Sequence, residues 1–322
     1  MKTIKKKLIV MIPCYNEEKT LPLVIKSIPK EIPGISMVET LVIDDGSTDK
    51  SAKIAKRLKA TVVSHHHNEG LGIAFQTGIK TALKMGADLI VNIDADMQFN
   101  PRDIPKLVRP IQNGEADMVT ASRFKDPNLI PKNMPRLKKW GNHWFTNLMN
   151  ILTRRKFTDT QCGYRAYSKE AALRMTLFGK FTYTQEVFLD LINKGIRIVE
   201  IPSRVKYRKG REAKISRSLS LYALRALLII LRTFRDYKPL VFFGLPGVIM
   251  FGIGNIFLII SAGYWILEHQ TTPVRMALFT GAFLSVFGLL LIVLALVADM
   301  LKRIRRNQEE LLYQSRIRNY KE

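Results

Sequence analysis

The stretch LIVNIDADMQ, residues 89–98, joins a short apolar run to two closely spaced carboxylates. Residues 89–93 are apolar at nearly every position, which is typical of a strand buried on both faces of a parallel sheet. Asp94 and Asp96 follow directly. Polar side chains at the carboxyl end of such a strand indicate a ligand site at that edge of an α/β sheet.

Three similar apolar runs lie upstream, separated by helical patterns. The runs cover residues 8–12, 40–43 and 61–63, and the helical patterns lie near residues 18–29, 49–58 and 71–85. This alternation predicts an α/β fold with a doubly wound parallel sheet. The motifs PCYNEE and DDGSTD follow the first two strands. Each polar motif alone could be an ordinary turn, but three at equivalent strand ends predict one shared site.

The paired carboxylates predict a metal site. Asp94 and Asp96 would repel each other and raise each other's pKa if nothing compensated their charge. Mg²⁺ or Mn²⁺ would do so, because hard cations bind carboxylate and phosphate oxygens together. We therefore expect a divalent metal ion that neutralises a diphosphate leaving group.

The second motif, VIDDGSTD, allows two roles that can coexist. Its Ser47 or Asp49 could cap the next helix, while Asp44 or Asp45 could accept hydrogen bonds from a base or ribose. Further on, the glycines of NEGLGIAFQTG, residues 68–78, are not spaced as G-x-G-x-x-G. They predict a helix start and a close backbone approach to the donor instead of a dinucleotide fingerprint.

The C-terminal third changes composition abruptly. Residues 239–267 and 277–298 contain no charged side chain, and each run is long enough to cross a bilayer. Buried core helices are the alternative, but no other helix-rich region could enclose them. A short loop joins the runs, so we expect a hairpin. Lys and Arg concentrate on both outer flanks, which predicts that the main domain is cytoplasmic.

The chain carries a formal net charge of +24 and a pI near 10.1, which raises the question of nucleic-acid binding. The sequence shows no zinc-finger, homeodomain or RRM signature. Anionic lipid headgroups and phosphorylated ligands explain basic segments beside a membrane more simply. The two cysteines, Cys14 and Cys162, form no CxxC pair, in keeping with a reducing compartment.

Seven ordered motifs carry a family resemblance: PCYNEE, VIDDGSTD, NEGLGIAFQTGI, NIDADMQFNP, ASRF, QCGYRAYSKEA and VEIPSRVKYR. Over residues 8 to about 215 the chain resembles the inverting family 2 glycosyltransferases, especially the polyprenyl-phosphate sugar transferases. The resemblance implies a GT-A catalytic domain over residues 1–215. It would be followed by a juxtamembrane amphipathic helix at 216–238, transmembrane helices within 239–300 (about 240–266 and 277–299), and a basic cytoplasmic tail at 301–322.

The resemblance also implies roles for individual residues. The nucleoside site would be lined by Pro13, Tyr15, Glu17, Asp44 and, beside it, Asp45. Asp94, Asp96 and Gln98 would hold the metal ion. The phosphates would be held by Arg123 and Arg136 on the acceptor and by Arg208 on donor or acceptor, with Glu186 as a further site residue. Arginine suits this task because its planar fork binds phosphate oxygens bidentately.

The expected reaction is inverting transfer of a hexose from a GDP-mannose or UDP-glucose type of donor to a polyprenyl phosphate, which gives a β-linked product. The acceptor phosphate is already an anion, so positioning and charge neutralisation would suffice without a strong base. The alternatives are a glycolipid or polysaccharide acceptor, and a non-catalytic membrane scaffold that binds nucleotide sugars.

Two features leave the membrane arrangement open. Residues 137–153 predict an amphipathic helix that either packs in the core or faces the membrane. The first apolar run contains four glycines that would allow close helix packing in a homo-oligomer, namely Gly244, Gly247, Gly252 and Gly254.

Overall fold

The computed structural model describes residues 6–131, 134, 136–177, 183–206, 224, 227–228, 231–232 and 234–320, with only the backbone at 136–138. The chain forms two compact units. The first comprises Met1–Ala226 together with Leu312–Glu322, and the second comprises Leu227–Leu311.

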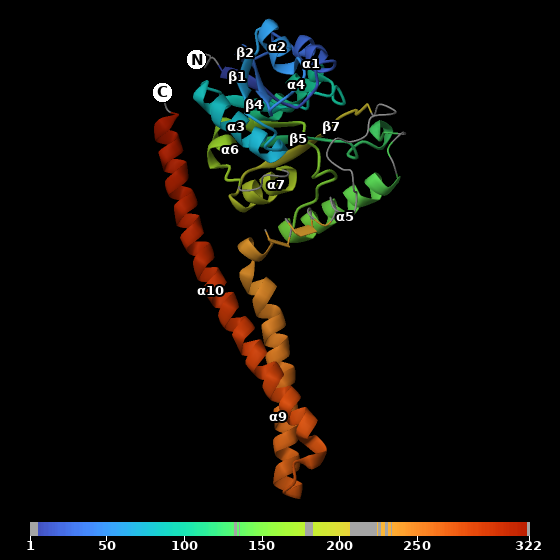
Figure 1. The fold of residues 1–322 in the computed structure, drawn as a ribbon, viewed down its shortest axis with the longest axis vertical. Helices are drawn as coiled ribbons and strands as arrows, with labels where there is room; N and C mark the ends of the chain where they lie inside the picture. Colours follow the sequence, from blue (N-terminus) through green and yellow to red (C-terminus); the bar gives the residue numbers. More distant parts are fainter. Residues whose placement is uncertain are drawn as a thin grey trace. The chain divides into compact units, whose positions relative to one another are not determined.

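The first unit is built on a seven-stranded sheet with the order β3-β2-β1-β4-β6-β5-β7. The strands are β1 (Lys6–Cys14), β2 (Ile35–Asp44), β3 (Thr61–Ser64), β4 (Leu89–Asn92), β5 (Met118–Ser122), β6 (Arg165–Ser168) and β7 (Ile198–Pro202). The helices of this unit are α1 (Leu21–Ser27), α2 (Ser51–Arg57), α3 (Leu71–Lys84), α4 (Ile104–Gln112), α5 (Arg136–Thr153), α6 (Lys169–Arg174) and α7 (Thr184–Asn193), with short 3₁₀ turns at Pro101–Asp103 and Pro127–Leu129. Figure 1 shows these elements around the sheet.

The predicted α/β fold is confirmed, and the four expected strands are β1 to β4. They pair in parallel. The sheet as a whole is mixed, however, because β6 runs antiparallel to both β4 and β5. The predicted parallel pairing is therefore confirmed for β1 to β4 and does not extend to β6.

Alternate side chains of β1 serve two different layers. Leu8, Val10 and Ile12 join the core that includes residues of α1 and α4. Met11 points to the opposite face, where its Sδ would lie only 2.0 Å from a Cβ placed on Gly78 of α3. Gly78 thus lets α3 lie directly on the sheet, so the predicted close backbone approach is to the sheet at this position.

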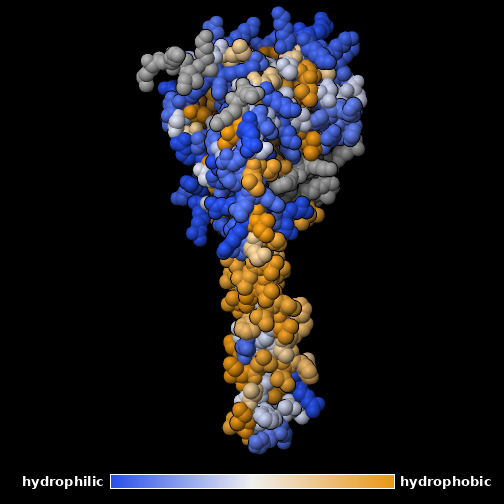
Figure 2. All heavy atoms as spheres, turned by 90° about the vertical axis from the view of Figure 1, so that its left-hand side faces the viewer, coloured by the Kyte–Doolittle hydropathy of each residue, from blue (hydrophilic) through white to orange (hydrophobic). Residues whose placement is uncertain are grey.

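The second unit contains the long helix α9 (Leu245–Glu268) and most of a second, α10 (Arg275–Asn319), joined through a 3₁₀ turn at Thr272–Val274. A π-helical turn, Leu240–Gly244, precedes α9. Both helices are long and apolar enough to cross a membrane, and only 11% and 17% of their most apolar windows are buried. Figure 2 shows their hydrophobic side chains on the surface. Exposed apolar helices of this length are typical of a transmembrane hairpin, not of a soluble core.

Small residues line the contact between α9 and α10. A Cβ on Gly254 would lie 2.5 Å from the Ser285 nitrogen, and one on Gly288 would lie 2.4 Å from the Phe251 nitrogen. Gly247 is similarly close to Gly288. Two of the glycines expected at an oligomer interface, Gly247 and Gly254, are therefore used inside the hairpin. A Cβ on Gly252, by contrast, would meet no neighbouring element of the described chain within 4 Å.

Candidate active site

The loops after β1 and β2 are joined into one surface. Asn16 adopts a left-handed φ of 54°, and its Oδ1 accepts hydrogen bonds from the backbone nitrogens of Thr48 at 2.8 Å and Asp49 at 3.3 Å. The Asn16 nitrogen donates to Ser47 Oγ at 3.0 Å, and the Glu17 nitrogen donates to Ser51 Oγ at 2.8 Å. The motifs PCYNEE and DDGSTD therefore meet, as their strand positions predict.

Four of the predicted nucleoside-site residues lie on this surface or at the strand ends beneath it. Pro13 and Asp44 are buried at the ends of β1 and β2, and Asp44 Oδ1 accepts from the Ser47 nitrogen at 3.1 Å. Glu17 accepts from the Thr20 hydroxyl at 2.7 Å, while the ring of Tyr15 is exposed. An exposed ring beside buried acceptors suits a base or ribose.

Asp45 organises the neighbouring loop. Its Oδ1 lies 2.8 Å from His65 Nδ1 and accepts from the Glu69 nitrogen at 3.0 Å, and its Oδ2 accepts from the Gly70 nitrogen at 2.9 Å. Gly70, at a φ of 97°, is the N-cap of α3, so the predicted helix start is confirmed. These contacts give Asp45 a structural role, and its contact with a nucleotide stays a prediction.

Asp94 and Asp96 lie directly beyond β4. The backbone turns sharply at Met97, whose φ is 59°, and the Gln98 nitrogen donates to Asp96 Oδ1 at 3.0 Å. A left-handed conformation is costly for a methionine and is found most often where function requires it. The turn places both carboxylates and Gln98 at the sheet edge.

The electrostatics of Asp94 fit a cation site. Burial and the charge of Asp96 raise the pKa of Asp94 to about 7, although Arg165 and Arg123 oppose the shift. A bound divalent cation would relieve this repulsion. Among the described residues no group of three His, Cys, Asp or Glu side chains surrounds a common point. The oxygen donors of Asp94, Asp96 and Gln98 suit Mg²⁺ or Mn²⁺, which can take their remaining ligands from substrate phosphates and water.

Three residues without a predicted role support Asp94 from below. Asn92 Nδ2 donates to the Gly163 carbonyl and to the Tyr183 hydroxyl, both at 2.8 Å. A Cβ on Gly163 would lie 3.4 Å from Asp94 Oδ2. The Tyr183 ring stacks on Phe75 at 3.8 Å between centroids. Asn92, Gly163 and Tyr183 thus form the floor of the site, beneath Asp94, and their packing holds Asp94 in place.

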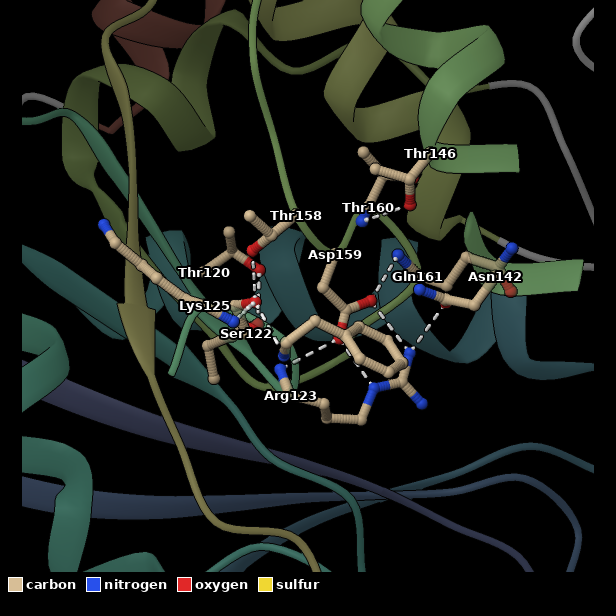
Figure 3. A network of polar contacts seen from close by, with 12 residues as sticks. Thr120, Ser122, Arg123, Lys125, Asn142, Thr146, Thr158, Asp159, Thr160 and Gln161 are labelled. Atoms are coloured by element: carbon tan, nitrogen blue, oxygen red, sulfur yellow. Dashed lines mark hydrogen bonds and ion pairs between the residues drawn. The ribbon is translucent and has the colours of Figure 1, made fainter. Parts of the chain in front are cut away.

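Arg123 lies in a buried polar network (Figure 3). Its Nε and Nη2 donate to Asp159 Oδ2 and Oδ1 at 2.6 and 2.8 Å, and Nη2 also donates to Asn142 Oδ1 of α5 at 3.0 Å. Burial raises the pKa of Asp159, but the Arg123 charge and hydrogen bonds outweigh it and hold the value below its usual range. Arg123 thus has a fixed orientation, its charge acts on Asp94, and its contact with a phosphate stays a prediction.

Glu200 of β7 supports the same network from the other side. Its carboxylate accepts from the backbone nitrogens of Thr158 and Asp159, each at 2.9 Å. Burial raises the pKa of Glu200, and these hydrogen bonds oppose the shift. The turn that presents Asp159 to Arg123 is therefore held by a second carboxylate.

Sequence reasoning missed a further cation, Arg165, which is fully buried in β6. Its Nη1 and Nη2 donate to the carbonyls of Thr184 and Thr160, both at 3.0 Å, and its charge lowers the pKa of Asp94. The motif QCGYRAYSKEA contains Arg165, but nothing in the local pattern distinguishes this arginine from a surface charge.

The remaining predicted residues are less well placed. Glu186 is half-buried in the first turn of α7. The backbone of Arg136 begins α5, while its side chain and the whole of Arg208 lie outside the described residues. The predicted juxtamembrane amphipathic helix at residues 216–238 is described only in part.

Comparison with known proteins identifies the family of the chain. The model of the family described as Glycosyl transferase family 2 matches residues 9–175. The chain is 34% identical to a UDP-N-acetylglucosamine–dolichyl-phosphate N-acetylglucosaminyltransferase of Methanococcus voltae, over 63% of this chain and 87% of that one. It is 30% identical to a polyprenol monophosphomannose synthase of Mycolicibacterium smegmatis, over 65% and 81%.

A solved structure shares the fold. It is glucosyl-3-phosphoglycerate synthase from Mycobacterium tuberculosis in complex with Mn²⁺, uridine diphosphate and phosphoglyceric acid, with 22% identity, a TM-score of 0.54, and coverage of 70% of this chain and 78% of that one. The fold and the site together define a glycosyltransferase with a GT-A-like domain. More narrowly, the chain belongs to glycosyl transferase family 2.

Proposed function

We propose that this glycosyltransferase moves a hexose from a nucleotide-diphosphate sugar of the GDP-mannose or UDP-glucose type to a polyprenyl phosphate. The observation that carries the proposal is the charge arrangement around Asp94, which combines a carboxylate pair with two buried arginines. Such a site suits two phosphate-bearing substrates. One relative is named as a transferase of N-acetylglucosamine to dolichyl phosphate. Another is named as a synthase of polyprenol monophosphomannose.

On the donor side, Tyr15, Glu17 and Asp44 would contact the nucleoside, with Pro13 and Asp45 shaping the surrounding loops. Asp94, Asp96 and Gln98 would hold Mg²⁺ or Mn²⁺. When bound, this ion supplies positive charge to the leaving diphosphate. The carboxylates themselves orient the donor, and the buried packing around Asp94 keeps them in place.

On the acceptor side, Arg123 would orient the lipid phosphate, helped by Arg136 and Arg208. The phosphate oxygen is the nucleophile and is anionic near neutral pH, so it needs no proton removed. In-line attack on the anomeric carbon inverts its configuration and converts an α-linked donor into a β-linked product. Catalysis then rests on orientation and charge stabilisation.

We also propose that the chain is an integral membrane protein whose catalytic domain is cytoplasmic. The domain bounds and the homo-oligomer predicted from the sequence remain part of this proposal. The two faces of helix α5 support contact with lipid, because one face packs in the core and the other is exposed and apolar. Phe145 and Met149 are buried, while Trp140 and Ile151 on the other face are 65% and 74% exposed. Exposed tryptophan next to basic residues is typical of membrane interfaces.

The test is transfer of label into lipid. Membranes with the full chain are incubated with Mn²⁺, a polyprenyl phosphate and a panel of radiolabelled nucleotide sugars. We expect one donor to label the lipid, and Asp96→Ala to reduce the rate by about a hundredfold or more, since charge stabilisation of this kind is worth several kcal/mol.

Asp103→Ala is the matched control, because Asp103 forms a surface ion pair with Lys106 and should transfer at the normal rate. If label enters a glycolipid or a polysaccharide but not the polyprenyl phosphate, the proposed acceptor is wrong and the labelled compound takes its place. Donor binding without any transfer would favour a scaffold.

A further inference from the structure

The last turns of α10 belong to the catalytic unit. Residues Leu312–Glu322 group with Met1–Ala226, apart from the remainder of the helix. Figure 1 shows this end of α10 beside α6. Tyr313 and Arg316 make polar contacts there, and both side chains reach α6 or the residue after it.

Tyr313 joins an ion pair on α6. Its hydroxyl hydrogen bonds to both carboxylate oxygens of Glu170, at 2.9 and 2.8 Å. Arg174, which is ion-paired with Glu170, lies 4.1 Å above the Tyr313 ring. The tyrosine thus contacts both charges of the pair, one through its hydroxyl and one through its ring face.

Arg316 caps the end of α6. Its Nη1 donates to the carbonyls of Leu173 at 2.9 Å and Met175 at 2.5 Å. Carbonyls at a helix C-terminus lack partners within the helix, and a cation there also complements the helix dipole. A side chain from a segment more than a hundred residues away in the sequence therefore terminates α6.

The same end of α6 is bound to α7. The Arg174 carbonyl accepts from Lys194 Nζ at 2.8 Å, and Asp190 Oδ2 accepts from the Thr176 nitrogen at 2.9 Å. Asp190 and Lys194 also form an ion pair at 2.8 Å. Helix α7 begins directly after Tyr183, which contacts Asn92 beneath Asp94. A continuous set of contacts therefore links α10, α6 and α7 to the floor of the site.

We propose that Tyr313 and Arg316 are positioning residues for sugar transfer: they form a clasp that fixes the end of α6, and thereby α7 and Tyr183 below Asp94. The inference rests on the proposed function for its catalytic consequence. It makes the C-terminal end of the second long helix a required part of the catalytic unit.

The test compares Arg316→Ala, Arg316→Lys and Tyr313→Phe in the full chain, with Arg318→Ala as control. Arg318 lies on the same helix and is exposed. Hydrogen exchange is measured over residues 169–176 and 184–194, with β1 as the internal reference. We expect Arg316→Ala to speed exchange there by about tenfold or more, because hydrogen bonds from a charged group are lost.

Transfer kinetics are measured on the same samples. We expect Arg316→Ala to lower kcat about fivefold, with a smaller change in the KM for the nucleotide sugar, since a displaced Asp94 costs orientation more than donor affinity. Arg316→Lys should recover part of the rate because an ammonium can still donate to both carbonyls. Tyr313→Phe should have a smaller effect in the same direction.

Unchanged exchange in Arg316→Ala would overturn the clasp. Faster exchange with a normal kcat would overturn its positioning role and leave a purely structural contact. If the wild-type protein itself transfers no sugar to lipid phosphate, the proposed function fails, and the exchange experiment still decides whether the clasp exists.

Discussion

The two halves of the candidate active site are stabilised by different interactions. The loops after β1 and β2 are joined by hydrogen bonds from backbone nitrogens to small polar side chains such as Asn16 and Ser47. The half around Arg123 depends on buried charges. The side chain of Asp159 is fully buried, and Glu200 is only 7% exposed. The loss of one such hydrogen bond should be tolerated better than the loss of one partner of a buried ion pair, because the latter leaves an uncompensated buried charge.

The largest expected effect comes from breaking the buried pair. Asp159→Ala leaves the Arg123 charge buried with its main carboxylate partner gone, which should cost about 3–5 kcal/mol in the free energy of unfolding. Thermal unfolding of the purified full chain measures the loss. Asp117→Ala provides the control, because its ion pair with Arg197 is on the surface and should cost about 1 kcal/mol or less. Equal losses in the two variants would show that burial does not make the Arg123–Asp159 pair more important than a surface pair.

A smaller effect is expected in the loop after β1. Asn16→Ala removes the acceptor for the Thr48 and Asp49 nitrogens and places alanine at a left-handed φ, which should cost about 1–2 kcal/mol. We expect the KM for the nucleotide sugar to rise more than kcat falls, since this loop contacts the donor in our proposal. Asn16→Gly is the informative partner variant, because it relieves the backbone strain without restoring the acceptor. If its KM is normal, the hydrogen bonds of Asn16 are not what orders the loop.

The smallest effect is a pH dependence confined to the Arg123 half. The pKa of Asp159 is lowered in the folded protein, so the folded state binds fewer protons than the unfolded state as the pH falls. Its stabilisation is complete above the unfolded pKa of about 3.9 and is lost as the pH drops through the lower folded value. The difference in stability between the wild type and Asp159→Asn should therefore shrink only below about pH 4. Denaturant titrations between neutral and acidic pH measure it, and a gap that stays constant would contradict the assigned pKa.

The difference between the loops after β1 and β2 and the half around Arg123 also explains what could be predicted from the sequence. Strands β1 to β4 are apolar runs followed by polar motifs, so both the strands and the meeting of their loops were predictable. The antiparallel β6 was not, because its sequence RAYS has no apolar run and begins with the buried Arg165. Its direction is set by pairing with β4 and β5, which no local pattern encodes.

The Arg123 network was only half predictable. Arg123 itself was identified from the family resemblance, but its partner Asp159 lies 36 positions away. Glu200 lies a further 41 positions along the chain from Asp159. A single sequence contains no signal that pairs charges over such separations, so these residues emerged only from the folded structure. The electrostatic influence of Arg165 on Asp94 was missed for the same reason.

The small residues of the helical hairpin recur with a period of seven. Gly247, Gly254 and Ser261 are the buried positions of α9, and Gly281, Gly288 and Ala295 repeat at the same interval on α10. A seven-residue repeat is slightly shorter than two helical turns, so it predicts a left-handed crossing of the two helices that keeps the seam closed. The large apolar side chains face outward instead, which leaves the outer surface free to vary while the seam stays fixed.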